Sequence, residues 1–163
     1  ACTSLIHASI SSRLDYCNAL LFGIPDTQMK RLQKVQNTAA RILTKTRKYD
    51  YITHILKSLH WLPVDKRIEF KINLLTFKCL HGEGPEYLTE LLTPYTPHRT
   101  LRSADRHLLC VPKTRLKTYG DRSFAKCAPT LWNSLPETVK SSQTLSIFKA
   151  ALKAHLFQVA YDM

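Results

Sequence analysis

Apolar residues recur at intervals of three and four along most of the chain, the spacing that places side chains on one face of an α-helix. A first run of this kind covers residues 5–21 and ends at the break formed by Gly23 and Pro25. A second begins at Asp26, whose side chain can accept hydrogen bonds from the free N–H groups of the first helical turn. Its predicted buried stripe consists of Met29, Leu32, Val35, Ala39, Ile42 and Leu43.

Shorter helices are predicted in the middle of the chain. One covers about residues 53–59, and Pro63 opens the next, because a missing N–H costs nothing in a first helical turn. That helix ends where Gly82 can adopt the left-handed conformation, and residues 85–92 form one more short helix. The helix after Pro63 has its buried positions at Ile68, Ile72, Leu74, Leu75, Phe77 and Cys79.

The pattern changes between residues 93 and 120, where three prolines interrupt any helix. Residues 108–111 have the composition of a short strand, and residues 115–119 can pair with them as a hairpin. Helical spacing resumes at residue 121 and runs past Trp132, with a kink or a split expected at Pro129.

A last amphipathic helix follows Ser142 or Thr144, either of which can cap it. Its apolar positions are Leu145, Ile147, Phe148, Ala151, Leu152, His155 and Leu156. The fold class expected from these elements is mainly α: one compact helical domain with a small β-hairpin near residues 107–119. We divide it into a helical part (1–92), a basic, proline-containing segment (93–120) and C-terminal helices (121–163).

Length and cysteine content narrow the class of protein. A chain of 163 residues suits one domain, and no apolar run approaches the roughly 20 residues that span a bilayer. The five cysteines are odd in number and form no Cys-x-x-Cys pair, which favours a reducing, intracellular compartment, nuclear or cytoplasmic. The chain opens at Ala1 within a helical pattern, so we interpret it as a piece of a longer protein.

The net charge is the feature of the composition that says most about function. Lys and Arg number 24 against 12 Asp and Glu, a formal net charge of +12, which favours a polyanionic partner such as RNA or DNA. Two regions concentrate this charge: residues 30–48, which contain no acid, and residues 99–117, where Asp105 is the one acid. Tyr95, His98 and Tyr119 lie in or beside the second region and can stack on bases. The predicted nucleic-acid-binding residues are Lys34, Arg41, Lys45, Arg47, Lys48, Arg99, Arg102, Arg106, Lys113, Arg115 and Lys117. A solvated polar helix face and a basic surface loop are the alternative interpretations.

Residue patterns for catalysis are missing. The acids are scattered rather than paired for metal-assisted phosphoryl chemistry, and neither a phosphate-binding loop nor a nucleophile elbow occurs. Asp15 is expected to pair with Arg13 or to cap a helix. Cys79 with His81, and His107 with Cys110, offer zinc-ligand types at a spacing unlike that of any standard finger. We therefore expect no enzyme activity, no metal and no cofactor.

Six short motifs follow one another in a familiar order. They are residues 12–18 (SRLDYCN), 32–41 (LQKVQNTAAR), 59–63 (LHWLP), 75–82 (LTFKCLHG), 119–124 (YGDRSF) and 131–136 (LWNSLP). Together they cover nearly the whole chain. The set resembles the region that follows the polymerase domain in CR1/L2/Rex-like (jockey-type) non-LTR retrotransposon (LINE) reverse transcriptases.

This resemblance implies an origin and partners. Family members copy element RNA into DNA with an aromatic-Ala-Asp-Asp polymerase site and an upstream endonuclease, and neither motif occurs in these residues. The resemblance therefore implies a non-catalytic C-terminal module that holds template RNA or target DNA, with residues 1–92 as the thumb-like end of the reverse transcriptase. Its partners would be RNA or DNA and the polymerase domain of the same polypeptide, with no membrane. The alternative is a structural module packed on the polymerase core, or a degenerate transposon relic.

Overall fold

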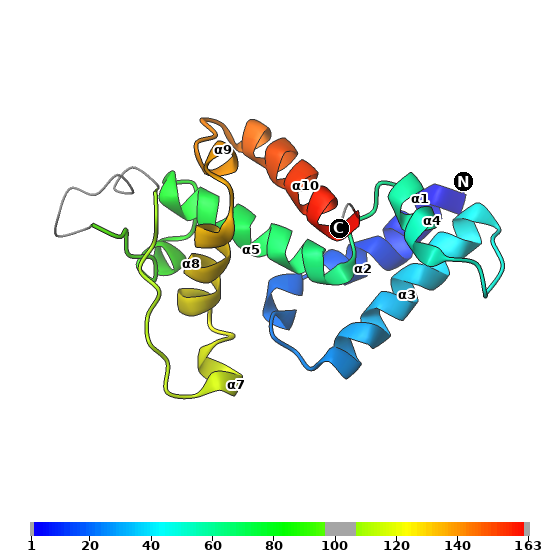
Figure 1. Cartoon of the computed structure of the whole chain (residues 1–163), viewed down its shortest axis with the longest axis horizontal. Helices are drawn as coiled ribbons and strands as arrows, with labels where there is room; N and C mark the ends of the chain where they lie inside the picture. The colour runs from blue at the N-terminus through cyan, green and yellow to red at the C-terminus, as the bar shows by residue number, and fades with distance from the viewer. Residues whose placement is uncertain (1, 97–106, 162–163) are drawn as a thin grey trace. The chain divides into compact units, whose positions relative to one another are not determined.

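The computed structural model describes residues 2–96 and 107–161 (Figure 1). These residues form helices joined by turns, and no strand occurs in the part described, so the mainly α prediction is confirmed. The chain divides into two compact units, one made of the residues up to Glu69 and from Ala154 onward, the other of Phe70–Lys153. The predicted boundaries at residues 92 and 120 both lie inside the second unit.

The first unit opens with a helical segment that is shorter than predicted. It consists of α1 (Cys2–Ile6), a π-helical turn (His7–Ser11) and α2 (Ser12–Asp15), and a 3₁₀ turn (Asn18–Leu21) follows. The helix stops after Asp15 because Tyr16 is extended and Cys17 is left-handed, with φ 51°. A single helix through Leu21 was therefore wrong: the turn at Cys17 buries Asn18 and leaves Leu20 exposed.

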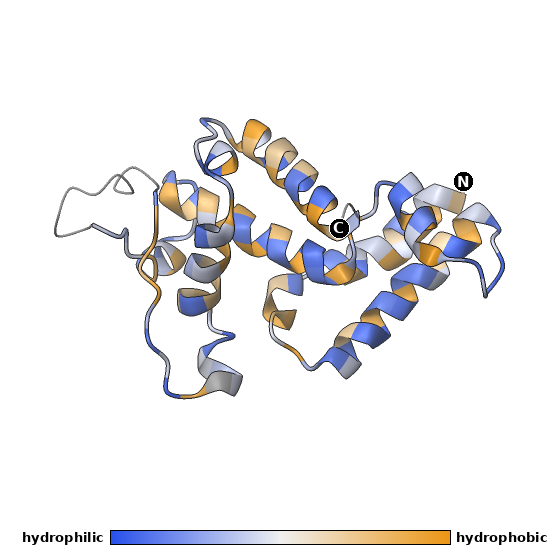
Figure 2. Ribbon diagram, in the orientation of Figure 1, coloured by the Kyte–Doolittle hydropathy of each residue, from blue (hydrophilic) through white to orange (hydrophobic). Residues whose placement is uncertain are grey.

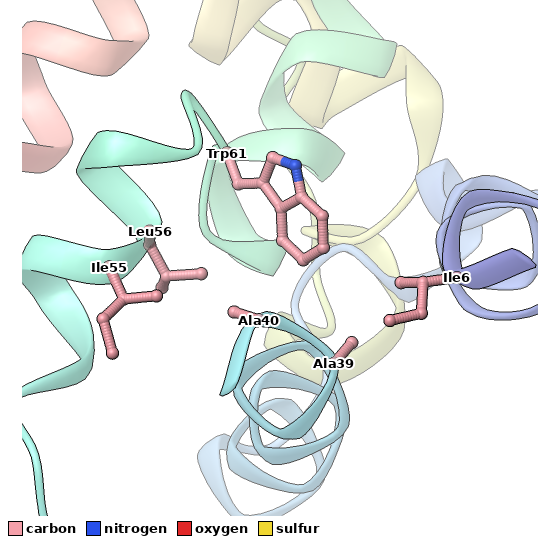
Figure 3. Packing of buried hydrophobic residues seen from close by; sticks show 6 residues of the cluster. All are labelled: Ile6, Ala39, Ala40, Ile55, Leu56 and Trp61. Carbon is pink, nitrogen blue, oxygen red and sulfur yellow. The ribbon is translucent and has the colours of Figure 1, made fainter. Parts of the chain in front are cut away.

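Helices α3 (Asp26–Thr44) and α4 (Ile52–Ser58) pack around the hydrophobic core of the first unit. Small side chains let α3 approach its neighbours closely, since Ala39 and Ala40 are fully buried (Figure 3). The cluster comprises Ile6, Ala39, Ala40, Ile55, Leu56 and Trp61. Pro25, not Asp26, occupies the position before α3, and its carbonyl accepts from the N–H groups of Gln28 and Met29. Asp26 instead lies in the first turn, where a negative charge favours the helix dipole.

The buried stripe of α3 differs from the predicted one. Val35 and Ile42 are 47% and 54% exposed, whereas Gln36 is buried. The helix is rotated toward Gln36 because that amide finds a hydrogen-bond partner inside the unit, Nε2 donating to the carbonyl of Leu62 at 2.8 Å. A buried polar group with a partner costs little, so hydrophobicity alone did not decide the inward face.

The second unit is built on an aromatic core. It contains residues of α5 (Val64–Leu80) and α10 (Leu145–Tyr161), together with α6 (Glu86–Thr89), α7 (Lys117–Gly120), α8 (Phe124–Ser134) and α9 (Glu137–Lys140). Phe148 is fully buried, with ring centroids 4.2 Å from Phe77 and 5.8 Å from Trp132. As predicted, Gly82 is left-handed after α5, with φ 72°.

Two local predictions in the second unit need refinement. Helix α8 continues through buried Pro129 without a split. Thr144 caps α10, its hydroxyl accepting from the N–H of Ile147 at 3.3 Å, while the hydroxyl of Ser142 donates to Val139 instead. Ile147 itself is 56% exposed and was wrongly placed in the buried stripe, because Phe148 next to it takes the inward position.

The predicted hairpin near residues 107–119 does not form. Leu109 makes one isolated antiparallel bridge, with Pro94, and three of the five residues expected to form the second strand, 117–119, belong to α7 (Lys117–Gly120). The other backbone edge of Leu109 is occupied by the side chain of Asn133, which leaves no edge for a second strand.

Candidate nucleic-acid interface

The outward face of α3 carries the first group of basic side chains. Lys30, Lys34 and Arg41 are separated by four and seven residues, which places them on one side of the helix. Gln36 and Ala39 occupy the opposite, buried side. Figure 2 shows hydrophilic residues along α3 and in the turn that follows it. The same residues that bury one face of α3 therefore direct its lysines to solvent.

The turn between α3 and α4 (residues 45–51) adds three more cations and is held by its backbone. Left-handed Lys45 ends the helix, its N–H donating to the carbonyl of Arg41. Asp50 closes a tight turn: its N–H donates to the carbonyl of Arg47 at 3.2 Å and its carboxylate accepts from the N–H of Arg47 at 2.8 Å. The Arg41 guanidinium donates to the carbonyl of Asp50 at 3.1 Å. These bonds keep Lys45, Arg47 and Lys48 beside the end of α3.

Positive charge on this surface is not neutralised within the described residues. No ion pair there involves the exposed side chains of Lys30, Arg31, Lys34, Lys45, Arg47 or Lys48. The nearby carboxylate, that of Asp50, is bonded to backbone. Arg41 differs from the others, because it is half-buried and braces the turn. We call α3 with residues 45–51 the basic face.

Two tyrosines in the same turn were missed by the sequence analysis. Tyr49 is 90% exposed and Tyr51 is 85% exposed, and the ammonium of Lys48 lies 5.9 Å from the ring centroid of Tyr49. The available signal was their position beside Lys48, in the stretch between two predicted helices.

The second predicted region belongs to the other unit. Lys113 and Arg115 are exposed, Lys117 begins α7, and Tyr95 and Tyr119 expose their rings. Arg99, Arg102 and Arg106, together with His98, lie outside the described residues. The two predicted basic regions are therefore parts of different units.

Thr114 and Gly120 approach closely at the base of this region. The hydroxyl of Thr114 donates to Asp121 at 2.6 Å, and the ammonium of Lys126 lies 3.0 Å from both groups. A Cβ at position 120 would lie 2.7 Å from that of Thr114, so only glycine fits. The contacts give Lys113 and Arg115 a fixed attachment point.

The segment that precedes Lys113 is anchored by side chains of α8. Asn133 donates to the carbonyl of Leu109 and accepts from its N–H, at 2.8 and 2.9 Å, while the indole of Trp132 donates to the carbonyl of His107 at 2.8 Å. On the other side, the N–H of Tyr95 donates to the carbonyl of Leu108 at 2.9 Å. Residues 93–95 and 107–110 are thereby held together.

Replacing Asn133 by alanine is expected to destabilise the second unit by about 1–3 kcal/mol, because both backbone groups of buried Leu109 lose their side-chain partner. Urea unfolding monitored by circular dichroism measures this loss. Substitution of exposed Ser134, the next residue, by alanine is the control and should cost less than about 0.5 kcal/mol. Equal effects at the two positions would contradict the anchoring role.

Two basic side chains contact the carboxylate of Glu137 beside this anchor. His107 Nδ1 lies 3.1 Å from one carboxylate oxygen of Glu137, and the Lys140 ammonium lies 3.2 Å from the other. Burial works to raise the pKa of Glu137, but the hydrogen bonds from His107 and Lys140 outweigh it and hold that pKa below its ordinary value.

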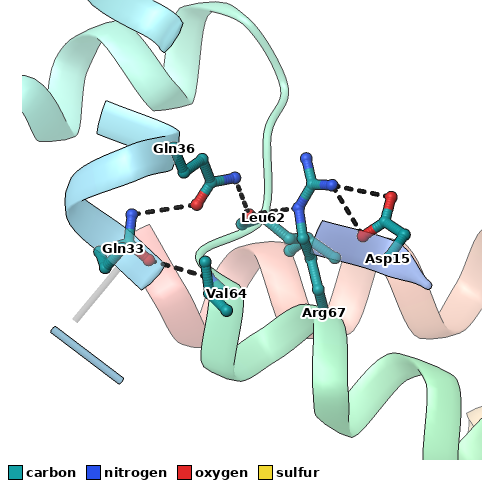
Figure 4. Close-up of polar contacts among 6 residues, drawn as sticks. All are labelled: Asp15, Gln33, Gln36, Leu62, Val64 and Arg67. Carbon is teal, nitrogen blue, oxygen red and sulfur yellow. Dashed lines mark hydrogen bonds and ion pairs between the residues drawn. The ribbon is translucent and has the colours of Figure 1, made fainter. Parts of the chain in front are cut away.

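Residues of three motifs meet in one polar network in the first unit (Figure 4). Gln33 accepts from the N–H of Val64 at 2.9 Å, and Arg67 donates to the carbonyl of Leu62 at 3.0 Å. Arg67 also makes two 3.0 Å bonds to the carboxylate of Asp15. The expected Asp15–Arg13 pair was therefore wrong: the partner lies far along the chain, where spacing in sequence gives no signal. Through these hydrogen bonds, the motif residues hold the first unit together.

The groups considered for metal or nucleophile chemistry are dispersed. Cys79 is buried, His81 Nδ1 lies 2.9 Å from the carbonyl of Phe77, and Cys110 is exposed. Among the described residues, no three His, Cys, Asp or Glu side chains group closely enough to hold an ion. Burial raises the pKa of the Cys127 thiol to about 11, so this side chain stays protonated at neutral pH.

No helix in the described residues combines the length and the apolar content that crossing a membrane requires. Comparison of the chain with protein-family models, with curated proteins and with solved structures finds no match.

Proposed function

We propose that this chain is a nucleic-acid-binding module without a reaction centre of its own, which holds RNA or DNA for a LINE-type RNA-directed DNA polymerase in the same polypeptide. The proposal of parentage is supported by the ordered motifs in the sequence. The proposal of binding is supported by one observation above all: the basic face presents exposed cations that have no carboxylate partner among the described residues.

Physical chemistry connects this surface to phosphates. Each phosphate that a lysine or arginine neutralises releases a counterion, and this release supplies most of the affinity in binding that is not sequence-specific. Cations already paired with carboxylates would contribute little, because that interaction would have to be broken first. The Arg41–Asp50 bond holds the backbone of the turn, so the cations there bind phosphates without any further ordering of the main chain.

Salt-titrated binding tests the proposed function. With roughly four to six phosphate contacts, the affinity for duplex DNA should fall with salt at a log–log slope of about −4 to −5. Fluorescence anisotropy of labelled duplex DNA and of labelled RNA, between about 50 and 200 mM KCl, measures this slope. Weak association that does not respond to salt would overturn the proposal.

A structural role on the polymerase core is the second candidate, and a separate observation favours it. The opening segment exposes apolar side chains, with Leu5 67%, Leu20 77% and Tyr16 80% exposed. A surface that another domain covers would expose these side chains once that domain is absent. In the titration above, this role alone predicts no salt-dependent binding.

A further inference from the structure

We infer that the turn between α3 and α4 is a stacking site for unpaired nucleotides, with the rings of Tyr49 and Tyr51 as the platforms and Lys45, Arg47 and Lys48 as the phosphate contacts. This inference rests on the proposed function and deepens it, because it names the form of nucleic acid that the basic face accepts. It assigns a site distinct from the aromatic side chains predicted near residues 95–119.

Both tyrosine rings are left uncovered by the fold. Tyr49 and Tyr51 are the most exposed large hydrophobic side chains of the described residues, at 90% and 85%. An aromatic ring left in water loses the stabilisation that burial would give it. Neither ring packs into the core formed by Ile55, Leu56 and the residues around them, so the fold itself makes no use of them.

Hydrogen bonds within the turn fix the backbone that carries the two rings. Asp50, between the two tyrosines, is bonded through its N–H, its carboxylate and its carbonyl, the last two to Arg47 N–H and to the Arg41 guanidinium. Tyr51 then precedes α4 directly. The backbone that carries both rings is therefore ordered before any ligand arrives, which lowers the entropy cost of binding.

Charge next to the rings identifies the ligand. Lys45, Arg47 and Lys48 are exposed on the same turn, and the Lys48 ammonium lies 5.9 Å from the Tyr49 ring centroid. A flat apolar ring beside cations complements a nucleotide, whose base offers a π-face and whose phosphate offers negative charge. Bases within a duplex are already stacked on each other, so only an unpaired base can stack on these rings.

The test compares two single strands of the same length, about 12 nucleotides, one of oligothymidylate and one abasic with the same phosphates. We expect the whole chain to bind oligothymidylate at least about tenfold more tightly than the abasic strand. The double variant Tyr49→Ala/Tyr51→Ala should lose about tenfold or more on oligothymidylate and less than about twofold on the abasic strand. An oligouridylate arm distinguishes RNA from DNA, and tighter binding of either base-bearing strand supports the site.

Two further variants make the result specific. Tyr49→Phe/Tyr51→Phe keeps both rings and should bind within about threefold of the wild type. Tyr16→Ala/Tyr87→Ala removes two rings that are 80% and 68% exposed and lie outside both predicted basic regions, and should leave binding unchanged. All four substituted side chains are exposed, so folding is preserved and circular dichroism verifies it.

The outcomes separate this inference from the proposed function. Wild-type chain that binds both strands equally, with a steep salt dependence, would overturn the stacking site and leave the proposed function standing. The stacking site is likewise overturned if Tyr49→Ala/Tyr51→Ala binds oligothymidylate as the wild type does. Wild-type chain that binds no strand and no duplex would overturn both.

Discussion

Replacing Lys34, Lys45 and Lys48 together by glutamine is expected to weaken duplex binding by about 10²- to 10³-fold at about 0.1 M salt. Each lost phosphate contact removes about 0.9 from the log–log salt slope, so the slope should become shallower by about 2.7. All three side chains are exposed and make no ion pair in the described part of the chain, so their removal should leave the fold unchanged. Anisotropy titrations at several salt concentrations give both quantities.

A charge-matched variant distinguishes a binding face from a general effect of net charge. Arg13, Lys149 and Lys153 are also exposed, and their replacement by glutamine removes the same three charges from residues outside the basic face. We expect this control to lose less than about threefold, because none of the three belongs to the basic face and an exposed charge that makes no contact with the ligand is largely screened by salt. Equal losses in the two triple variants would show that binding follows the total charge and would contradict the assigned face.

Phe148→Ala is expected to destabilise the second unit by about 3–5 kcal/mol. Phe148 is fully buried, stacks on Phe77 and also contacts the ring of Trp132, so truncation removes aromatic contacts and leaves a cavity. A loss of this size is a large share of the roughly 5–15 kcal/mol that stabilises a typical domain. Urea unfolding, followed by circular dichroism and by tryptophan fluorescence, measures it.

Ile147→Ala is the matched control for this prediction. Ile147 is the preceding residue of α10 and is 56% exposed, so its truncation should cost less than about 0.5 kcal/mol. Comparing the stabilities of the two variants shows which of these two adjacent apolar residues faces the core. Similar unfolding midpoints for Phe148→Ala and Ile147→Ala would contradict the position of α10 described above.

The candidate site could be predicted only in part from the sequence. The acid-free run of residues 30–48 identified the basic residues, because a helix with one apolar face necessarily directs its lysines outward. The same pattern could not separate Arg41, which braces the turn, from Lys45 and Lys48, which are exposed. The pattern also gave no indication that Tyr49 and Tyr51 are exposed, because the exposure of a ring depends on which surfaces the rest of the chain covers.

Most helices were determined by the sequence itself, since periodic apolar positions, Pro63 and Gly82 act through contacts within a few residues. The tertiary structure alone decided which face of α3 is buried and that Asp15 pairs with Arg67. It also decided that the Asn133 side chain, and not a second strand, bonds to the backbone N–H of Leu109. In each of these a polar group is satisfied by a partner distant in sequence. Hydropathy records the cost of burying such a group but not the partner that offsets it.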